Sequence, residues 1–299
     1  MKDIALKIID DLKKYDSLYV IGHNNTDADS YFSSYILSVI LKSFGLNTKF
    51  SILEDYKLLE EDKDLMNDYL KEKPNIIKYS ELKDKNIILV DHNDPSQSVK
   101  DNPCNIVLSI DHHIETNRVK NSYSIEYTST ALYIYDLFKE VYDFSKELKE
   151  LIALTVMTDS CYLTTSRFKD SDKLLYNELN VDLDVTKVRD KYFKTIDFNS
   201  EVDYNINNNH KVYHVDNMEI NRIIFKSYSR DRKYLEEYIN RANELYSNNL
   251  FIWNEFDTLI TEVYYKGEFL KKYDHIVTSS MLITKDLIKE IREKYNWQE

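Results

Sequence analysis

Four short segments that bring Asp together with His, Asn, Thr or Ser constrain this chain most: residues 23–29, 91–94, 111–113 and 158–160. The first three follow apolar runs that predict β-strands, at 18–21, 87–90 and 106–110. In an open α/β sheet the carboxyl ends of parallel strands face one crevice, so these side chains should meet in space. Clustered carboxylates repel one another unless cations neutralise them. The pattern therefore predicts a multinuclear metal site, a kind of site that commonly carries out hydrolysis at phosphorus.

Composition narrows the class of protein. A chain of 299 residues can form one large domain or two ordinary ones. Its net charge of −12 argues against a broad duplex nucleic-acid surface, although bound cations would still admit a small anionic substrate. No apolar run reaches the length of a membrane span, and the N-terminus lacks signal-peptide features. With only two cysteines, the sequence predicts a cytoplasmic protein without a disulfide framework.

The N-terminal half alternates between helical and extended patterns, which predicts an α/β fold with a parallel sheet. Helices are expected at 4–14, 31–44, 129–142 and 146–158, and a charged, helical stretch at 54–74. Strands are expected at 18–21, 47–53, 75–78, 87–91 and 106–110. Gly45 is the expected stop of the second helix.

The pattern changes beyond about residue 180 and predicts a smaller, mixed α/β domain. The expected elements are a helix at 184–195, an Asn-rich turn at 205–209, a strand at 219–226, a helix at 231–247, a strand at 256–265 and a helix at 284–295. The sequence thus predicts one domain over 1–175 and a second over 185–299, with a linker within 166–186.

The first segment offers His23, Asp27 and Asp29 directly after a strand. In an extended loop Asp27 and Asp29 would point the same way, because side chains repeat every second residue. Imidazole together with carboxylates suits Mn²⁺, Co²⁺, Zn²⁺ or Fe²⁺ better than Mg²⁺. The alternative for Asp27 is a structural one, the N-cap of the following helix.

The other segments offer Asp91, two adjacent histidines, and Asp159. Asp91 at a strand end could bridge two cations about 3.5–4 Å apart, or simply begin a turn. His92 beside it is expected to orient a ligand rather than bind the metal itself. His112 and His113 should point to opposite sides of an extended backbone, so that one binds a metal and the other faces the substrate. Asp159 is expected to be a metal ligand, the alternative being a structural cap or turn.

Taken in order, these segments resemble the DHH phosphoesterase superfamily, which is named for the Asp-His-His found here at 111–113. Within it the chain most resembles the manganese-dependent (family II) inorganic pyrophosphatases, since Asp-His-Asn at 91–93 is followed by Gln97-Ser98. The matching stretches are residues 21–30, 89–98, 109–113, 127–131 and 158–163.

The resemblance implies two Mn²⁺ ions per chain, with Co²⁺ or Mg²⁺ as possible replacements. The first would be held by His23, Asp27 and Asp91, and the second by Asp29, Asp91, His112 and Asp159. It also implies that His113 contacts substrate phosphate, and that His113, Asp27 and His92 belong to the catalytic group. The family hydrolyses pyrophosphate to phosphate, through attack by a metal-bridging hydroxide on phosphorus.

The C-terminal part departs from that family. Where family II pyrophosphatases carry a Ser-Arg-Lys-Lys segment that holds the substrate, residues 277–285 contain one late lysine, Lys285. Arg222 and Arg230 are the other cations expected to bind substrate, and Lys226, Arg232 and Lys233 lie near them. The Gly-Gly-His signature of the nuclease branch is missing as well.

Two alternatives to a pyrophosphatase therefore stay open. One is a DHH-type phosphodiesterase or exopolyphosphatase acting on short oligonucleotides, cyclic dinucleotides or polyphosphate. The other is a regulatory or binding protein that keeps the metals without turnover. If the protein is an enzyme of either kind, we expect its partner to be a small phosphorylated substrate, and we expect it to bind neither duplex nucleic acid nor a membrane. The chain could form a homodimer.

Overall fold

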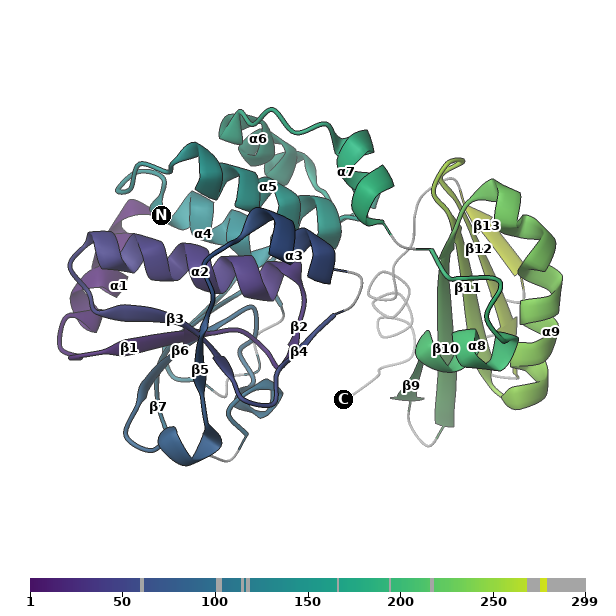
Figure 1. The fold of residues 1–299 in the computed structure, drawn as a ribbon, viewed down its shortest axis with the longest axis horizontal. Helices are drawn as coiled ribbons and strands as arrows, with labels where there is room; N and C mark the ends of the chain where they lie inside the picture. Colours follow the sequence, from purple (N-terminus) through teal and green to yellow (C-terminus); the bar gives the residue numbers. More distant parts are fainter. Residues whose placement is uncertain are drawn as a thin grey trace. The chain divides into compact units, whose positions relative to one another are not determined.

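The computed structural model describes residues 1–59, 62–100, 104–113, 116, 119–165, 167–193, 195–215, 218–267 and 275–278. The chain divides into two compact units (Figure 1). The first contains Met1–Leu163 and Arg167–Tyr192, and the second is built mainly from Phe193 onward. The helix expected at 284–295 and the candidate substrate residue Lys285 lie outside the described residues.

The first unit is built on a six-stranded sheet in the order β5-β3-β1-β6-β7-β8, and every pair in it is parallel. Its strands are β1 (Leu18–Ile21), β3 (Thr48–Leu53), β5 (Asn75–Ile77), β6 (Asn86–Val90), β7 (Asn105–Asp111) and β8 (Ser122–Ser124). From β1 the chain adds strands outward on one side, then crosses back to β6 and continues on the other. The order reverses between β1 and β6, which is where open α/β sheets bind their ligands.

Helices cover one face of this sheet (Figure 1). The helices of the first unit are α1 (Lys2–Leu12), α2 (Ala28–Ser43), α3 (Lys63–Tyr69), α4 (Thr130–Phe138), α5 (Lys146–Asp159), α6 (Asp170–Leu179) and α7 (Val185–Tyr192). Helix α2 packs on β1 and β3, and α4 and α5 pack on α2. Most of α2 is therefore buried, which fixes its first turn at the end of β1.

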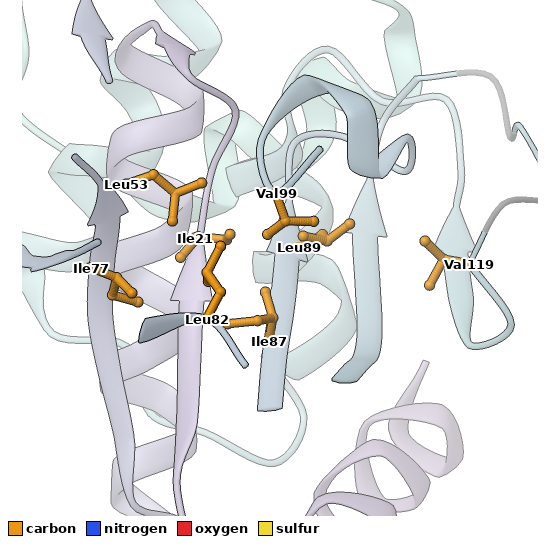
Figure 2. Packing of buried hydrophobic residues seen from close by; sticks show 8 residues of the cluster. All are labelled: Ile21, Leu53, Ile77, Leu82, Ile87, Leu89, Val99 and Val119. Atoms are coloured by element: carbon orange, nitrogen blue, oxygen red, sulfur yellow. The ribbon is translucent and has the colours of Figure 1, made fainter. Parts of the chain in front are cut away.

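The other face of the sheet packs under short turns and loops rather than long helices. Ile21, Leu53, Ile77, Ile87 and Leu89 on the strands form one buried cluster with Leu82, Val99 and Val119 (Figure 2). Leu82 follows the short helix η1 (Tyr79–Glu81), and Val99 follows η2 (Pro95–Gln97) closely. Because the central strands are buried on both faces, they read as continuous apolar runs in the sequence.

The second unit contains a five-stranded mixed sheet in the order β13-β12-β11-β10-β9. Its strands are β9 (His210–Val215), β10 (Met218–Ser227), β11 (Asn249–Glu255), β12 (Ile260–Lys266) and β13 (His275–Thr278). Its helices are α8 (Val202–Asn208) and α9 (Leu235–Leu245). Among these described strands, β10 and β11 are paired in parallel, joined through η3 (Ser229–Tyr234) and α9, and the other pairs are antiparallel. Phe225, Trp253 and Tyr238 fill its core.

The architecture confirms the predicted fold class, a parallel-sheet α/β domain followed by a smaller mixed α/β domain. Among the described residues, no helix is long and apolar enough to cross a membrane.

Several predicted elements are wrong. The described residues of the stretch 54–74 form the short strand β4 (Lys57–Leu58), paired with β2 (Asn25–Thr26), and the seven-residue helix α3. The expected Asn-rich turn at 205–209 falls mostly on α8, because the Asn205 side chain bonds to Asp197 O and to Tyr238 Oη inside the unit. Tertiary contacts there override the local preference of Asn for turns.

Two further differences concern missed elements. The sequence predicts one strand at 256–265, whereas the structure has β11 and β12 on either side of a turn at Phe256–Leu259. The expected linker at 166–186 contains α6, which packs against α4 and α5 and extends the first unit beyond residue 175. Leu179 anchors that helix in the core, so the segment is part of the domain.

We predict that Leu89→Ala lowers the free energy of unfolding by about 2–5 kcal/mol, because Leu89 on β6 is fully buried in the cluster with Leu82, Val99 and Val119. The matched control is Leu174→Ala on α6, where the leucine is 68% exposed and the change should cost less than about 0.5 kcal/mol. Denaturant unfolding followed by circular dichroism measures both. Equal losses for the two variants would contradict the described packing.

Candidate metal centre

The candidate ligands gather at the point where the strand order reverses. His23 follows β1 and Asp91 follows β6, and His23 Nε2 lies 3.1 Å from Asp91 Oδ2. His112 follows β7, with Nε2 3.4 Å from Asp91 Oδ1. Asp159 ends α5, and its Oδ2 lies 3.7 Å from His112 Nε2. Side chains that are more than 130 residues apart in the sequence (159 − 23 = 136) thus share one small volume.

Gly22 allows the start of α2 to approach β1 closely. A Cβ at Gly22 would lie 2.0 Å from Ser30 Oγ, and the His23 amide donates to that oxygen at 2.9 Å. Asp27 is the N-cap of α2: its Oδ1 accepts from the Ser30 amide at 2.9 Å, while its Oδ2 lies 3.5 Å from His23 Nε2. Asp27 therefore caps the helix with one oxygen and faces the cluster with the other.

Asp29 lies in the first turn of α2, so the extended-loop geometry expected for Asp27 and Asp29 is wrong. Its carboxylate reaches the start of α4, where the amides of Thr130 and Ala131 donate to it at 2.6 and 3.0 Å. A helix N-terminus favours an anion. Nevertheless burial, with the charges of Asp91 and the other nearby carboxylates, raises the pKa of Asp29 well above its usual value. Ionisation of Asp29 is therefore disfavoured at this place, in spite of the two amides that donate to it.

Asp91 is the central residue of the cluster. It is 2% exposed and has a backbone φ of +63°, a left-handed conformation that costs of order 1–3 kcal/mol and concentrates at functional sites. Its amide donates to Ile110 O at 3.0 Å, and its Oδ1 accepts from Thr130 Oγ1 at 2.9 Å. Both carboxylate oxygens thus have fixed positions, Oδ1 toward His112 and Oδ2 toward His23.

The ring of His112 is oriented as metal-binding imidazoles usually are. Its Nδ1 lies 3.0 Å from Tyr127 O, a carbonyl that can only accept, so Nδ1 carries the hydrogen. The lone pair of Nε2 therefore faces Asp91 and Asp159, ready to bind a cation.

His92 has both ring nitrogens engaged by protein groups. Nδ1 lies 2.9 Å from Val90 O, and Nε2 lies 2.7 Å from Ser98 Oγ. Burial is the main influence on this ring and lowers its pKa to about 4, so it is neutral. Its ring centroid is 6.2 Å from that of His23. This arrangement suits orienting the neighbouring ligands, and the role expected for His92 stays a prediction.

His113 is held by Asp111, whose position the sequence left without a role. Its Nδ1 lies 2.8 Å from Asp111 Oδ1, and the His113 side chain is 38% exposed. Asn93 Nδ2 donates to the other oxygen of Asp111 at 2.6 Å. Burial raises the pKa of Asp111, but the hydrogen bond and charge of His113 outweigh it, and the pKa falls below its usual value. Asn93 is the last residue of the Asp-His-Asn segment at 91–93, so this motif is the sequence signal that could have predicted its contact with Asp111.

The candidate ligands form three groups, and within each group the possible ligand atoms lie within 4.8 Å of one another. The groups are His23, Asp27 and Asp91; Asp29, His112 and Asp159; and Asp91, His112 and His113. The third group shares Asp91 with the first and His112 with the second. All six predicted metal residues therefore lie in one cluster. Imidazole nitrogens with carboxylate oxygens fit Mn²⁺ and similar cations. The raised pKa of Asp29 supports the same fit, because a divalent cation would supply the missing positive charge.

The structure does not test whether the two arginines expected to bind substrate, Arg222 and Arg230, do so. Arg222 is buried in β10, at 6% exposure. Arg230 is exposed, with its guanidinium 4.9 Å from the centre of the Tyr228 ring. Both belong to the second unit, and their contact with substrate stays a prediction.

We predict that binding Mn²⁺ releases protons. Burial lowers the pKa of His23, but the charges and hydrogen bonds of Asp27 and Asp91 outweigh it and raise the pKa to about 11. Below that pH the metal-free imidazole keeps its proton, which a metal must displace. Mn²⁺ affinity should therefore rise between pH 6 and 8 by about tenfold per unit for each proton displaced.

Calorimetric titration at pH 7 in two buffers of different ionisation enthalpy measures this release. The matched variant His23→Gln should release about one proton fewer than the wild type. A binding heat that does not depend on the buffer would contradict the described charge state.

Comparison with known proteins agrees with this geometry. Residues 17–158 match the DHH family, N-terminal domain. A manganese-dependent inorganic pyrophosphatase of Methanocaldococcus jannaschii is 30% identical over an alignment of 181 residues, and the match covers 54% of this chain and 54% of that protein. The manganese-dependent inorganic pyrophosphatase of Methanothrix thermoacetophila is 26% identical over an alignment of 172 residues, and the match covers 55% of this chain and 54% of that protein. The chain thus matches about half the length of these curated relatives.

Solved structures extend the likeness in fold. A crystal structure from Methanococcus jannaschii assigned to the family II inorganic pyrophosphatases has a TM-score of 0.68 at 20% identity, covering 93% of this chain and 99% of that one. An exopolyphosphatase-related protein from Bacteroides fragilis has a TM-score of 0.54 at 16% identity, covering 98% and 95%. At these identities the likeness concerns the fold alone. The similarity in sequence is to the DHH family, N-terminal domain, and it covers residues 17–158 of this chain.

Proposed function

We propose that the protein is a manganese-dependent phosphohydrolase that cleaves pyrophosphate to phosphate. The observation that carries the proposal is the pair of ligand groups, each with imidazole and carboxylate donors, on either side of Asp91. The curated relatives named as manganese-dependent inorganic pyrophosphatases support the choice of metal and substrate.

Two cations would be held by the cluster. His23, Asp27 and Asp91 would bind one, and Asp29, His112 and Asp159, with Asp91 between the two groups, would bind the other. When bound, such ions supply positive charge to phosphoryl oxygens and lower the pKa of a bound water. Co²⁺ could replace Mn²⁺ with these donors, and Mg²⁺ fits less well because it prefers oxygen ligands alone.

The chain's own residues would orient the substrate. His113 is the most exposed of the clustered histidines, and Asp111 fixes its ring beside Asp91, with Nδ1 3.7 Å from Asp91 Oδ1. An imidazole at the edge of the cluster can donate a hydrogen bond to a phosphate oxygen. We assign His113 this contact, and we assign His92 the positioning of the β6 loop.

One observation favours the second candidate, a phosphodiesterase or exopolyphosphatase. A pyrophosphatase must hold the end of its substrate that the metals leave unneutralised, usually with Lys or Arg. In the second unit Arg232 is already paired with two buried carboxylates, with Glu255 at 2.7 Å and with Glu262. The two glutamates neutralise the positive charge of Arg232, so less positive charge is available in this part of the chain to bind pyrophosphate. A substrate with less negative charge would need less of it.

We predict about two Mn²⁺ ions per chain at saturation, because two ligand groups flank Asp91. His23→Gln should retain about one, since it removes a donor from one group only. Elemental analysis after removal of unbound metal measures both variants. Fewer than one ion per wild-type chain would refute the dinuclear site.

The proposed activity is tested with a substrate panel of pyrophosphate, tripolyphosphate, a dinucleotide and a cyclic dinucleotide. We expect Mn²⁺-loaded protein to release phosphate from pyrophosphate fastest, and Asp91→Asn to lose at least about 100-fold in rate. Preference for a nucleotide diester would replace the proposal with the phosphodiesterase. Turnover of none of them by fully loaded protein would favour a binding protein. A cytoplasmic location and a homodimer stay predictions of the sequence.

A further inference from the structure

The start of α4 is bonded to two of the proposed metal ligands. The amides of Thr130 and Ala131 donate to Asp29 at 2.6 and 3.0 Å. The Thr130 hydroxyl donates to Asp91 at 2.9 Å. Thr130 and both carboxylates are at most 2% exposed, so solvent cannot replace these contacts.

The residues just before α4 reach a third ligand. Tyr127 O accepts the hydrogen bond that orients His112, at 3.0 Å. Ser129 caps α4 by accepting from the Leu132 amide at 3.2 Å. The segment 127–131 thus fixes three proposed ligands, and any displacement of it would move all three together.

Asp172 anchors this segment from α6. Its Oδ2 accepts from both the amide and the hydroxyl of Thr128, each at 2.7 Å. Its Oδ1 accepts from Ser171 Oγ at 3.0 Å. Asp172 is 2% exposed and Thr128 is fully buried. The contact links α6 to the segment 44 residues away in the sequence.

A buried carboxylate is a costly anchor. Within the part of the chain that the structure describes, no Lys or Arg forms an ion pair with Asp172, whose charge is favoured only by hydrogen bonds and by the first turn of α6. In return, hydrogen bonds to an ionised acceptor are shorter and stronger than neutral ones. Such an anchor suits a segment whose position matters.

We propose that Asp172 is a positioning residue for the metal centre, acting through Thr128 to hold the segment 127–131 against Asp29, Asp91 and His112. The inference rests on the proposed function to the extent that these residues bind metal. It adds a residue that lies outside the ligand cluster and on a helix that the sequence pattern assigned to a linker.

Calorimetric titration of the full chain with Mn²⁺ tests this. We expect Asp172→Ala to weaken Mn²⁺ binding about 10- to 100-fold, the usual effect of losing a residue that orients ligands. Asp172→Asn should weaken it less than about fivefold, because an amide oxygen can still accept from both Thr128 donors. A purely structural role would lower thermal stability in Asp172→Ala without changing the affinity of the folded protein.

The matched control is Thr48→Val, which removes an equally buried hydroxyl that donates to Ser38 O at 2.8 Å in the same unit. It should leave Mn²⁺ affinity within about twofold of wild type, since it touches no residue of the cluster. Wild-type affinity in folded Asp172→Ala, or an equal loss in Thr48→Val, would overturn the inference.

If Asp172→Ala does not fold, Thr128→Val removes the contacts of the hydroxyl with Asp172 and with Arg167 O, keeps the amide contact, and should weaken Mn²⁺ binding about threefold or more. Unchanged affinity in that variant overturns the inference. Absence of Mn²⁺ binding in wild type overturns the proposed function as well, whereas normal binding in wild type and all variants overturns only the role of Asp172.

Discussion

The crowding of buried carboxyl groups beyond the ends of β1 and β6 is the constraint on which the candidate site depends. Asp29 and Asp91 are at most 2% exposed and lie among other carboxylates, and burial together with those charges raises the pKa of Asp29. Asp111, equally buried, is compensated by His113, and its pKa falls instead. The contrast separates Asp111, which orients a neighbour, from Asp29, whose charged form a bound cation would favour.

The sheet alone does not build the site, because two helix N-termini complete it. Helix α2 begins at the cluster with Asp27 as its cap, and α4 directs its first free amides at Asp29. Free N–H groups and the helix dipole favour anions at both places. The packing of α4 and α5 on α2 therefore sets the geometry of the candidate ligands as well as the stability of the domain.

The sequence predicted much of this region, because strands buried on both faces appear as apolar runs and their polar ends are conspicuous. It placed Asp29 in an extended loop, because the helix was expected to begin at residue 31. The alternative that Asp27 is the N-cap of this helix is the one that the structure shows. The sequence offered no role for Asp172, because an Asp in a polar stretch resembles any surface residue until α6 is packed. In the second unit the local signal for Asn pointed to a turn, while the bond from Asn205 to Tyr238 stabilises a helix.

Anomalous diffraction from crystals grown with Mn²⁺ tests the central claim most directly. The account predicts two peaks about 3.5–4 Å apart, one contacting His23 and Asp27, the other contacting Asp29, His112 and Asp159, with Asp91 touching both. Strong Mn²⁺ peaks elsewhere on the protein, with none among these side chains, would contradict it.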